Sequence, residues 1–434
     1  MNPNPPSASR RQVLRSGSVA ALAAAASPFA ARGHARSRET LRVGLIGCGG
    51  RGTGAAKNAL SADPDVVLVA LGDAFDDHLQ NSLRTLQGDA EVGARVQVAP
   101  DHQFVGFDAY KKVIDACDVV LLATSPHFRP LHMAYAVEKG VHLFVEKPVA
   151  TDATGTRSVL ESSRKAAEKG LAVVSGLCYR YQFAKQETMR RLHDGAIGDV
   201  VALQCTYNTG GLWHRGRKPE WSEMEYQMRN WLYFAWLSGD HIAEQHIHSL
   251  DKVAWAMGDE PPVLCTSTGG RSARTEAKWG NVYDHFQTVY EWANGVRAFS
   301  SCRQIVGASS DVSDFTFGTK GVAELQSHRI RGEERWRWRG EGPDDMYQNE
   351  HDAFFKSIRK GEPINNGEYM CKSTMMAIMA RMSAYSGKTV TWEQAWNSPE
   401  DLSPAAYAWG DAPEPRVAVP GVTPLVIAES GAGQ

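Results

Sequence analysis

A glycine-rich turn between a short apolar run and an expected helix constrains this chain most. Residues 41–46 form a buried-strand pattern, Gly47, Gly49 and Gly52 follow it, and residues 52–60 are expected to be helical. In such a unit the first glycine allows a tight turn, the second lets a pyrophosphate approach the backbone, and the third lets helix and strand pack closely. The spacing therefore predicts a dinucleotide-binding turn, with phosphates held by free amides at the helix start.

An acidic residue stands where this kind of turn needs one. Asp73 ends the apolar run 66–71, about twenty residues beyond Gly52, which is where a carboxylate accepts from the adenosine ribose hydroxyls. A carboxylate there repels a 2′-phosphate, so NAD is favoured over NADP, although NADP stays open. The other predicted cofactor-binding residues are Gly50, Arg51, Thr124, His127, Glu146 and Lys147.

The pattern of apolar runs predicts two domains. Runs at 41–46, 66–71, 119–123 and 142–145 alternate with helical segments, which is typical of a doubly wound parallel sheet of the Rossmann type covered on both faces. From residue 200 onward β-rich stretches predict an α+β domain with a large, mainly antiparallel open sheet, and Asn294-Gly295 is a hairpin signal. The predicted boundaries are 1–38 for a leader, 39–152 and 153–396 for the two domains, and 397–434 for an irregular arm.

The N-terminus carries the pattern of a twin-arginine signal peptide. Arg10-Arg11 precedes an Ala-rich apolar run that ends near Phe29, and this run is too short and too Ala-rich for a good membrane span. We therefore expect passage through the twin-arginine translocase, a periplasmic or secreted location, and no stable membrane span. A chance Arg-Arg pair before an irregular arm is the alternative.

Charge and cysteine usage exclude some classes of function. The formal net charge is −2 over 434 residues, so nucleic acid is not an expected partner. The seven cysteines include no CxxC pair and are expected to be small buried hydrophobic residues rather than disulfide partners.

The segment Glu146-Lys147-Pro148 lies at the carboxyl end of a predicted strand, the edge at which open α/β sheets bind ligands. A lysine partly buried near a cationic nicotinamide has its pKa depressed toward a useful range for proton transfer. Pro148 fixes the local backbone and is a candidate for the cis form. Lys147 is therefore a candidate catalytic residue.

A third segment, from Ser238 to Trp255, brings acidic and imidazole side chains together. On a continuous helix Glu244 and His248 would lie at i, i+4, and the carboxylate would orient the ring and raise its basicity. A competing reading is a metal site built from His241, Glu244, His246 and His248. We predict no metal; the metal site and a purely structural role of this segment as a helix cap are the two open alternatives.

Three segments carry a resemblance to a known family: the GCGGRG turn, the stretch ATSPHFRPLHMAYAVEKGVHLFVEKPVATD and the segment HSLDKVAW. In these segments the chain resembles the Gfo/Idh/MocA oxidoreductases, the family of glucose-fructose oxidoreductase and inositol dehydrogenase. The resemblance extends from Leu41 to about Gln394, and GLCYRYQ and EYQMRNW resemble a secreted branch. It implies that Lys147 and His248 flank the substrate hydroxyl and that Glu244 takes the place of the family's aspartate.

This resemblance implies a carbohydrate substrate held between the two domains. Aromatic faces stack on sugar C–H surfaces and arginine binds oxygens. The predicted substrate-binding residues are Arg129, Arg180, Tyr181, Trp213, Arg229 and Trp231.

The main functional hypothesis is an exported NAD(P)-dependent oxidoreductase that transfers hydride between a tightly bound nicotinamide and a sugar, polyol or cyclitol. One alternative is glycoside hydrolysis, in which transient oxidation of a ring hydroxyl acidifies the neighbouring C–H, elimination and water addition follow, and the hydride returns. A second alternative is a non-catalytic exported sugar-binding protein. The resemblance also implies a homodimer or homotetramer.

Overall fold

Six parallel strands form the sheet that carries the glycine turn. The computed structural model describes residues 39–426, so the predicted signal peptide at 1–38 lies outside the described residues. The strand order is β3-β2-β1-β4-β5-β6, which is a doubly wound arrangement with β1 beside β4 at the centre. The strands are β1 Leu41–Ile46, β2 Val66–Asp73, β3 Gln103–Val105, β4 Val119–Leu122, β5 His142–Val145 and β6 Val173–Ser175.

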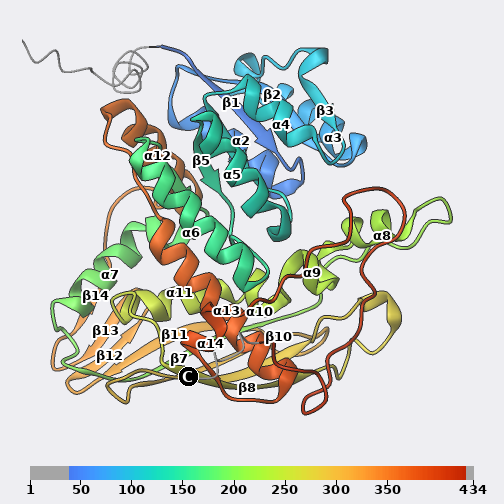
Figure 1. Cartoon of the computed structure of the whole chain (residues 1–434). Helices are drawn as coiled ribbons and strands as arrows, with labels where there is room; N and C mark the ends of the chain where they lie inside the picture. Colours follow the sequence, from blue (N-terminus) through green and yellow to red (C-terminus); the bar gives the residue numbers. More distant parts are fainter. Residues whose placement is uncertain (1–38, 427–434) are drawn as a thin grey trace, which may run out of the picture.

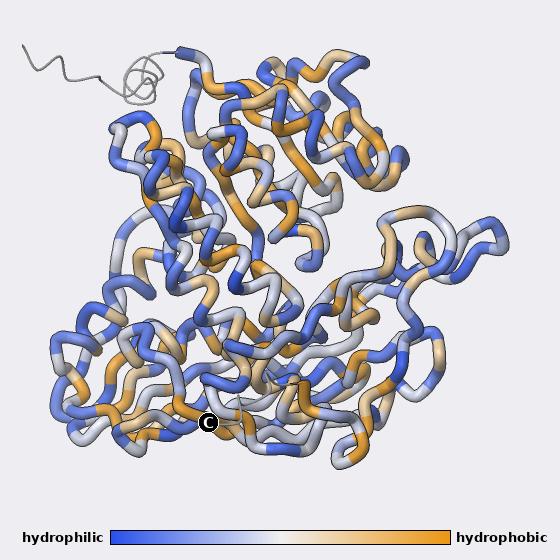
Figure 2. The backbone as a smooth tube through the Cα atoms, in the orientation of Figure 1, coloured by the Kyte–Doolittle hydropathy of each residue, from blue (hydrophilic) through white to orange (hydrophobic). Residues whose placement is uncertain are grey.

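Helices cover both faces of this sheet, as the continuous apolar runs predict. All residues of β4 and β5 are buried, and apolar segments gather around these strands in the hydropathy view (Figure 2). Leu45 belongs to the core on one face, and Ile46 belongs to the core on the other. The helices are α2 Gly50–Ala62, α3 Asp76–Gln87, α4 Ala109–Ala116, α5 Arg129–Lys139 and α6 Ala153–Glu168.

The first sheet continues beyond residue 152, where we predicted its domain to end. Strand β6 pairs in parallel with β5, and helix α12 (Met346–Lys360) returns from the far part of the chain to pack against α2. Its Phe354 and Phe355 lie in the same core cluster as Val43. A strand is expected from the sequence at 172–175, but the sequence does not show which sheet it joins, and α12 lies more than 170 residues further along the chain.

The second sheet is mixed and mostly antiparallel, and its nine strands have the order β14-β13-β12-β11-β7-β10-β9-β8-β15. Only β10 and β7 pair in parallel, and Asn294-Gly295 closes the β9–β10 hairpin as predicted, with Gly295 at a φ of 81°. The strands are β7 Val200–Thr209, β8 Leu264–Gly270, β9 His285–Glu291, β10 Arg297–Gln304, β11 Asp311–Gly318, β12 Gly321–Glu324, β13 Arg329–Gly332, β14 Trp336–Arg337 and β15 Val390–Thr391.

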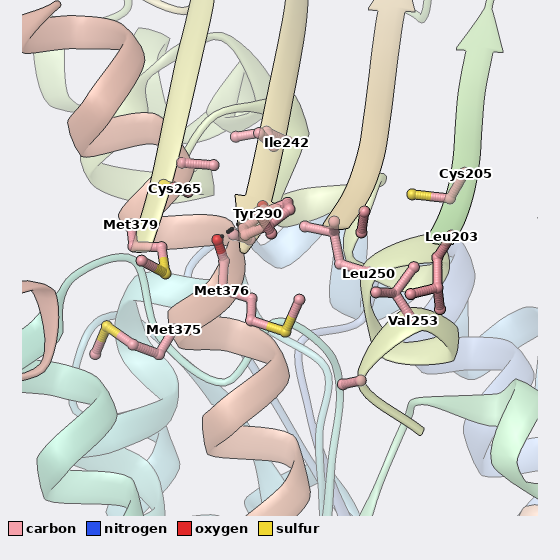
Figure 3. Close-up of a cluster of buried hydrophobic side chains, with 14 of the residues drawn as sticks. Leu203, Cys205, Ile242, Leu250, Val253, Cys265, Tyr290, Met375, Met376 and Met379 are labelled. Atoms are coloured by element: carbon pink, nitrogen blue, oxygen red, sulfur yellow. Dashed lines mark hydrogen bonds between the residues drawn. The ribbon is translucent and has the colours of Figure 1, made fainter. Parts of the chain in front are cut away.

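Helices pack on one face of this second sheet, between it and the Rossmann-type domain (Figure 1). Met375, Met376 and Met379 of α13 lie against the strands (Figure 3), and Tyr290 donates a hydrogen bond to the Met376 carbonyl at 3.0 Å. The remaining helices are α7 Phe183–His193, α8 Glu223–Arg229, α9 Ala235–Ser238, α10 His241–Glu244, α11 Ile247–Ala256, α13 Gly367–Ser386 and α14 Trp392–Trp396.

The described part of the C-terminal arm, residues 397–426, has no regular secondary structure and runs beside α8 (Figure 1). The Met224 amide donates to the Gly410 carbonyl at 2.9 Å. None of the helices between residues 39 and 426 is long and apolar enough to span a bilayer. The seven cysteines are buried and unpaired, as expected from the sequence.

Candidate active site

The glycine turn has the close contacts that its spacing predicts. Gly47 has a φ of 96°, and a Cβ there would lie 2.6 Å from the Ala123 backbone. A Cβ on Gly52 would lie 1.9 Å from the Gly47 carbonyl oxygen, whereas Cβ atoms on Gly49 and Gly50 would meet nothing within 4 Å. The turn is therefore tightly packed on its sheet side and open at the start of α2, where free backbone amides can bind phosphate.

A cavity of about 400 Å³ opens in front of this turn, at the carboxyl ends of the parallel strands. Asp73 and Thr124 line it together with the five predicted turn residues Gly47, Gly49, Gly50, Arg51 and Gly52. These residue types in this arrangement fit a dinucleotide, with the pyrophosphate at the helix start and a ribose near Asp73.

Asp73 also holds the turn itself. Its carboxylate accepts from the Cys48 amide at 2.6 Å and from the Phe75 amide at 2.9 Å. Burial raises the pKa of Asp73, against the opposing effects of His78 and of these two amides. The acidic residue at the end of β2 therefore fixes the conformation of the turn in addition to facing the cavity.

Arg51 links the turn to two other segments. Its Nε is 2.5 Å from Glu146 Oε1, its Nη2 is 3.0 Å from Glu350 Oε1 on α12, and its guanidinium lies 4.6 Å from the Tyr347 ring. Burial opposes the charge on Arg51, but the two carboxylates outweigh it and raise its pKa. Glu146 does not line the cavity. It accepts a hydrogen bond from Arg51, which does line the cavity, so the structure gives Glu146 a supporting position beside the turn.

Lys147 of the Rossmann-type domain contacts Glu244 of the second domain, so the candidate site is formed where the two domains adjoin. The Lys147–Pro148 peptide bond is cis. The Lys147 ammonium donates to the Glu244 backbone carbonyl at 2.5 Å and to its carboxylate at 3.2 Å. Both side chains are about 15% exposed (15% for Lys147 and 16% for Glu244), so the pair is accessible to a small molecule yet largely screened from water.

The predicted pairing of Glu244 with His248 on one helix is wrong. Helix α10 ends at Glu244 and α11 begins at Ile247, so the two residues lie on separate helices. The break arises because the intervening Gln245 and His246 bond to the second sheet, through Gln304 at 2.7 Å and Ser300 at 2.6 Å. Glu244 pairs with Lys147 instead.

His248 is buried beside the cationic groups of the site. Burial, followed by the charges of Lys147, Lys252 and Arg51, lowers its pKa well below the usual value, so the ring is neutral near neutral pH. Its Nδ1 is buried and has no hydrogen-bond partner among the described residues. A neutral imidazole with an unused nitrogen can bond a substrate hydroxyl.

The metal reading of this segment does not fit the geometry. His241 bonds Asp240 at 3.0 Å and lies 3.4 Å from the Cys302 sulfur, while His246 bonds Ser300, so both rings are engaged in the core of the second domain. Across residues 39–426 no group of three or more His, Cys, Asp or Glu side chains is placed to hold a metal ion.

Two of the predicted substrate-binding residues have structural roles. Arg180 donates to both Asp251 and Asp259, at 2.8 Å and 2.6 Å from Nη2, and its guanidinium lies 4.2 Å from the Tyr369 ring. Tyr181 is buried and donates to Asn366 at 2.8 Å. Neither residue lines the cavity in front of the glycine turn, and neither do Lys147, Glu244 and His248. Arg180 and Tyr181 differ from those three because their donors are used inside the protein.

Arg129 and His127 are also engaged within the protein. Arg129 is buried and donates to the backbone carbonyls of Thr124 and Pro148, so it joins the end of β4 to the turn that carries Lys147. His127 bonds the Tyr407 hydroxyl of the C-terminal arm at 2.9 Å, and burial lowers its pKa to about 4. Neither lines the cavity.

The other three predicted substrate residues, Trp213, Arg229 and Trp231, do line a cavity, but it is the one in front of the glycine turn. Arg229 forms an ion pair with Asp77 at 3.1 Å and lies 4.0 Å from the Phe75 ring, both just beyond Asp73. The structure therefore places them on the cofactor side rather than in a separate sugar pocket.

Sequence reasoning missed Tyr179, which lies next to His248 with ring centroids 5.3 Å apart and planes nearly perpendicular. The ammonium groups of Lys252 and Lys185 lie 4.4 Å and 4.7 Å from the Tyr179 ring. It also missed Glu350, which binds Arg51. Tyr179 stands in the GLCYRYQ segment quoted for the resemblance, whereas nothing in the sequence near Glu350 points to the site.

Comparison with known proteins agrees with this arrangement. Residues 41–175 match the model of an oxidoreductase family with an NAD-binding Rossmann fold, and residues 186–324 match the model of a GFO/IDH/MocA C-terminal domain. Together the two models match well over half of the chain.

Individual relatives are more distant. The chain is 25% identical to a glycosyl hydrolase family 109 protein of Streptomyces coelicolor, over 94% of this chain and 93% of that protein. It is 22% identical to a myo-inositol 2-dehydrogenase of Thermotoga maritima, over 82% and 99%. In fold it is similar to the crystal structure of aldose-aldose oxidoreductase from Caulobacter crescentus complexed with glycerol, with a TM-score of 0.63 and 19% identity over 81% of this chain and 100% of that one.

The parallel sheet with its glycine turn agrees with the Rossmann-fold model, and the second, mostly antiparallel domain lies where the C-terminal model matches. This chain belongs to the Gfo/Idh/MocA family of NAD-binding oxidoreductases.

Proposed function

We propose that the protein oxidises or reduces a CH–OH group of a sugar, polyol or cyclitol with a tightly held NAD(H), and that it works outside the cytoplasm. The observation that carries this proposal is the contact of Lys147 with Glu244, next to buried, neutral His248. The named relatives, an inositol dehydrogenase and an aldose oxidoreductase, support the substrate class.

The cofactor would be held by the glycine turn, by Asp73 and by Thr124. When bound, NAD supplies the hydride acceptor or donor. Asp73 favours NAD, since its carboxylate would repel a 2′-phosphate.

The protein's own residues would then handle the hydroxyl proton. His248 accepts or donates a hydrogen bond that orients the hydroxyl. Lys147 Nζ passes one of its protons to the Glu244 carboxylate as it takes the hydroxyl proton, so the lysine ends as an ammonium again, Glu244 ends protonated, and the pair gains the one positive charge that the proton carried. We assign the relay to Lys147 because Glu244 touches Lys147 and not His248.

Export and cofactor retention are linked parts of this proposal. The Arg10-Arg11 pattern supports twin-arginine export of a folded protein. Outside the cytoplasm a dissociable NAD would be lost, so the cofactor has to be regenerated in place by a second substrate or by the same one. For assembly we propose a homodimer or homotetramer through the outer face of the second sheet, where Phe299 is 45% exposed.

A second candidate function is the NAD-dependent cleavage of a glycosidic bond. The full-length similarity to the family 109 protein favours it, and the same Lys147 and His248 would serve the transient oxidation. Release of a reducing sugar from an aryl glycoside without net NADH would distinguish cleavage from net redox chemistry.

The deciding experiment is native mass spectrometry of the purified protein, followed by a sugar panel read at the nicotinamide absorbance. We expect bound NAD(H) that one class of sugar reduces or oxidises. Full turnover in both Lys147→Met and His248→Ala would overturn the assigned roles. Sugar binding without any hydride exchange would favour a non-catalytic binding protein.

A further inference from the structure

One wall of the cofactor cavity comes from outside the parallel sheet. Residues 210–231, which we call the cap loop, follow β7 of the second domain and end just after α8. This loop faces the strand ends of the Rossmann-type domain across the cavity. Its contributions to the cavity wall are Trp213, Arg215, Met228, Arg229 and Trp231.

The cap loop is fastened at the adenosine end of the cavity. The Arg229 guanidinium donates to both carboxylate oxygens of Asp77, at 3.1 Å and 3.2 Å, and lies 4.0 Å from the Phe75 ring. Phe75 and Asp77 lie two and four residues beyond Asp73, and Asp73 holds the position that binds the adenosine ribose in folds of this kind. Arg229 therefore bridges the two domains over the adenosine half and not over the nicotinamide half.

The C-terminal arm closes the same end from a third direction. The Trp409 ring lies 4.8 Å from Phe107 and 5.5 Å from Phe75, between ring centroids, and both of these phenylalanines line the cavity. Nearby, the Tyr407 hydroxyl bonds the His127 ring at 2.9 Å.

The arm and the cap loop also hold each other. The Met224 amide donates to the Gly410 carbonyl at 2.9 Å, and the Gln227 side chain donates to the Pro413 carbonyl at 2.9 Å. Figure 1 shows the arm running alongside α8. The Rossmann-type domain, the cap loop and the arm thus form a closed series of contacts around one end of the cavity.

We propose that the cap loop and the arm form a composite adenosine site, so that the cofactor dissociates only when the arm detaches. Trp213 and Trp231 offer flat faces suited to adenine, and Arg229, held by the carboxylates of Asp77 and Glu225, closes the cavity wall beside them. Trp409 is a positioning residue, because it acts on the cavity through Phe75 and Phe107. This inference rests on the proposed function, since it assumes a bound dinucleotide.

The test measures the rate at which NADH leaves the protein. Full-length protein loaded with NADH is mixed with excess pyruvate and lactate dehydrogenase, which oxidise every released NADH, and nicotinamide fluorescence is followed. We expect Trp409→Ala and Arg229→Gln each to raise the release rate by about tenfold, the effect of losing one good aromatic or cationic contact. Trp338→Ala, an aromatic truncation at the far edge of the second sheet, should leave the rate unchanged.

The hydride-transfer rate in a single turnover of cofactor-loaded protein separates a holding role from a general loss of structure. In Trp409→Ala and Tyr407→Phe it should change less than twofold, because neither residue lines the cavity or contacts Lys147, Glu244 or His248. If Trp409→Ala does not fold, Arg229→Gln and Tyr407→Phe, which keeps the ring and removes the bond to His127, decide the question. Unchanged release in the folded variants overturns the composite site and leaves the proposed function intact. A wild-type protein that binds no nicotinamide overturns both.

Discussion

The ammonium of Lys147 donates to both the backbone carbonyl and the side-chain carboxylate of Glu244, although the two residues are 97 positions apart and belong to different domains. This contact holds the end of β5 in the Rossmann-type domain against helix α10, which packs on the second sheet. Because the contact is a hydrogen bond, proton transfer between the Lys147 ammonium and the Glu244 carboxylate depends on how the two domains are placed.

Replacement of Lys147 by Met should abolish proton transfer and leave the cofactor bound. We expect the single-turnover hydride-transfer rate to fall about 10²–10⁴-fold, the usual contribution of a positioned acid or base. Nicotinamide absorbance of the purified protein reports cofactor content. Lys165→Met removes an exposed lysine on α6 and should leave the rate unaltered. A normal rate in Lys147→Met would exclude Lys147 from the chemistry.

Glu244→Gln should be more damaging than its small change in shape suggests. The amide keeps the length of the side chain but cannot receive a proton from Lys147, so we expect turnover to fall about 10²-fold. Glu244→Asp keeps the charge and shortens the side chain. Partial activity in the aspartate variant with low activity in the glutamine variant would support a relay, while equal losses would indicate a role in shape alone.

Stability should fall as the pH drops below about 6.5. Burial lowers the pKa of His127 to about 4 and that of His132 to about 3, so the unfolded chain binds more protons than the folded one between the folded values and 6.5. The free energy of unfolding is thus fully retained above pH 6.5 and is lost as the pH falls toward 4, by roughly 3 kcal/mol for a group shifted as far as His127.

Urea unfolding at several pH values measures this loss. His132→Phe should flatten the curve between pH 6.5 and 4, because Phe can keep the stacking on Tyr110, where the ring centroids are 4.2 Å apart, without titrating. An unchanged slope would show that His132 takes up a proton in the folded protein.

Arg180→Met should destabilise the protein without changing its affinity for substrate. The substitution leaves the buried carboxylate of Asp251 without its cation, and breaking a buried pair costs about 3–5 kcal/mol. Arg190→Met, at an exposed pair with Glu187, should change stability by less than about 1 kcal/mol. A raised KM in a stable Arg180→Met variant would instead restore the sequence-based assignment.

Local patterns predicted the elements of this fold well because their causes are local. The apolar runs at 119–122 and 142–145 are buried strands, and Gly47 adopts the positive φ that its turn demands. The helical pairing of Glu244 with His248 failed because distant strands bond Gln245 and His246 and interrupt the helix. Spacing along a sequence cannot reveal a break imposed from another part of the fold.

The sequence was least informative about which arginines bind a ligand. Arg180 binds Asp251 and Asp259, which are more than 70 residues away in sequence. Arg229 binds Asp77, at a separation of 152 residues. Whether an arginine binds a ligand or a carboxylate of its own chain depends on these long-range partners. The glycine turn and Lys147 were easier to assign because their neighbours in sequence already place them at a strand end.

The return of α12 to the first domain has a consequence for how the protein is made. Phe354 and Phe355 complete the core beside α2, and Glu350 completes the partners of Arg51 in the turn. Synthesis proceeds from the N-terminus, so a nascent chain that stops before residue 346 lacks part of the interior of its first domain. The dinucleotide-binding half therefore completes its core only when the last fifth of the chain is translated, and we expect a cofactor to be loaded after that step.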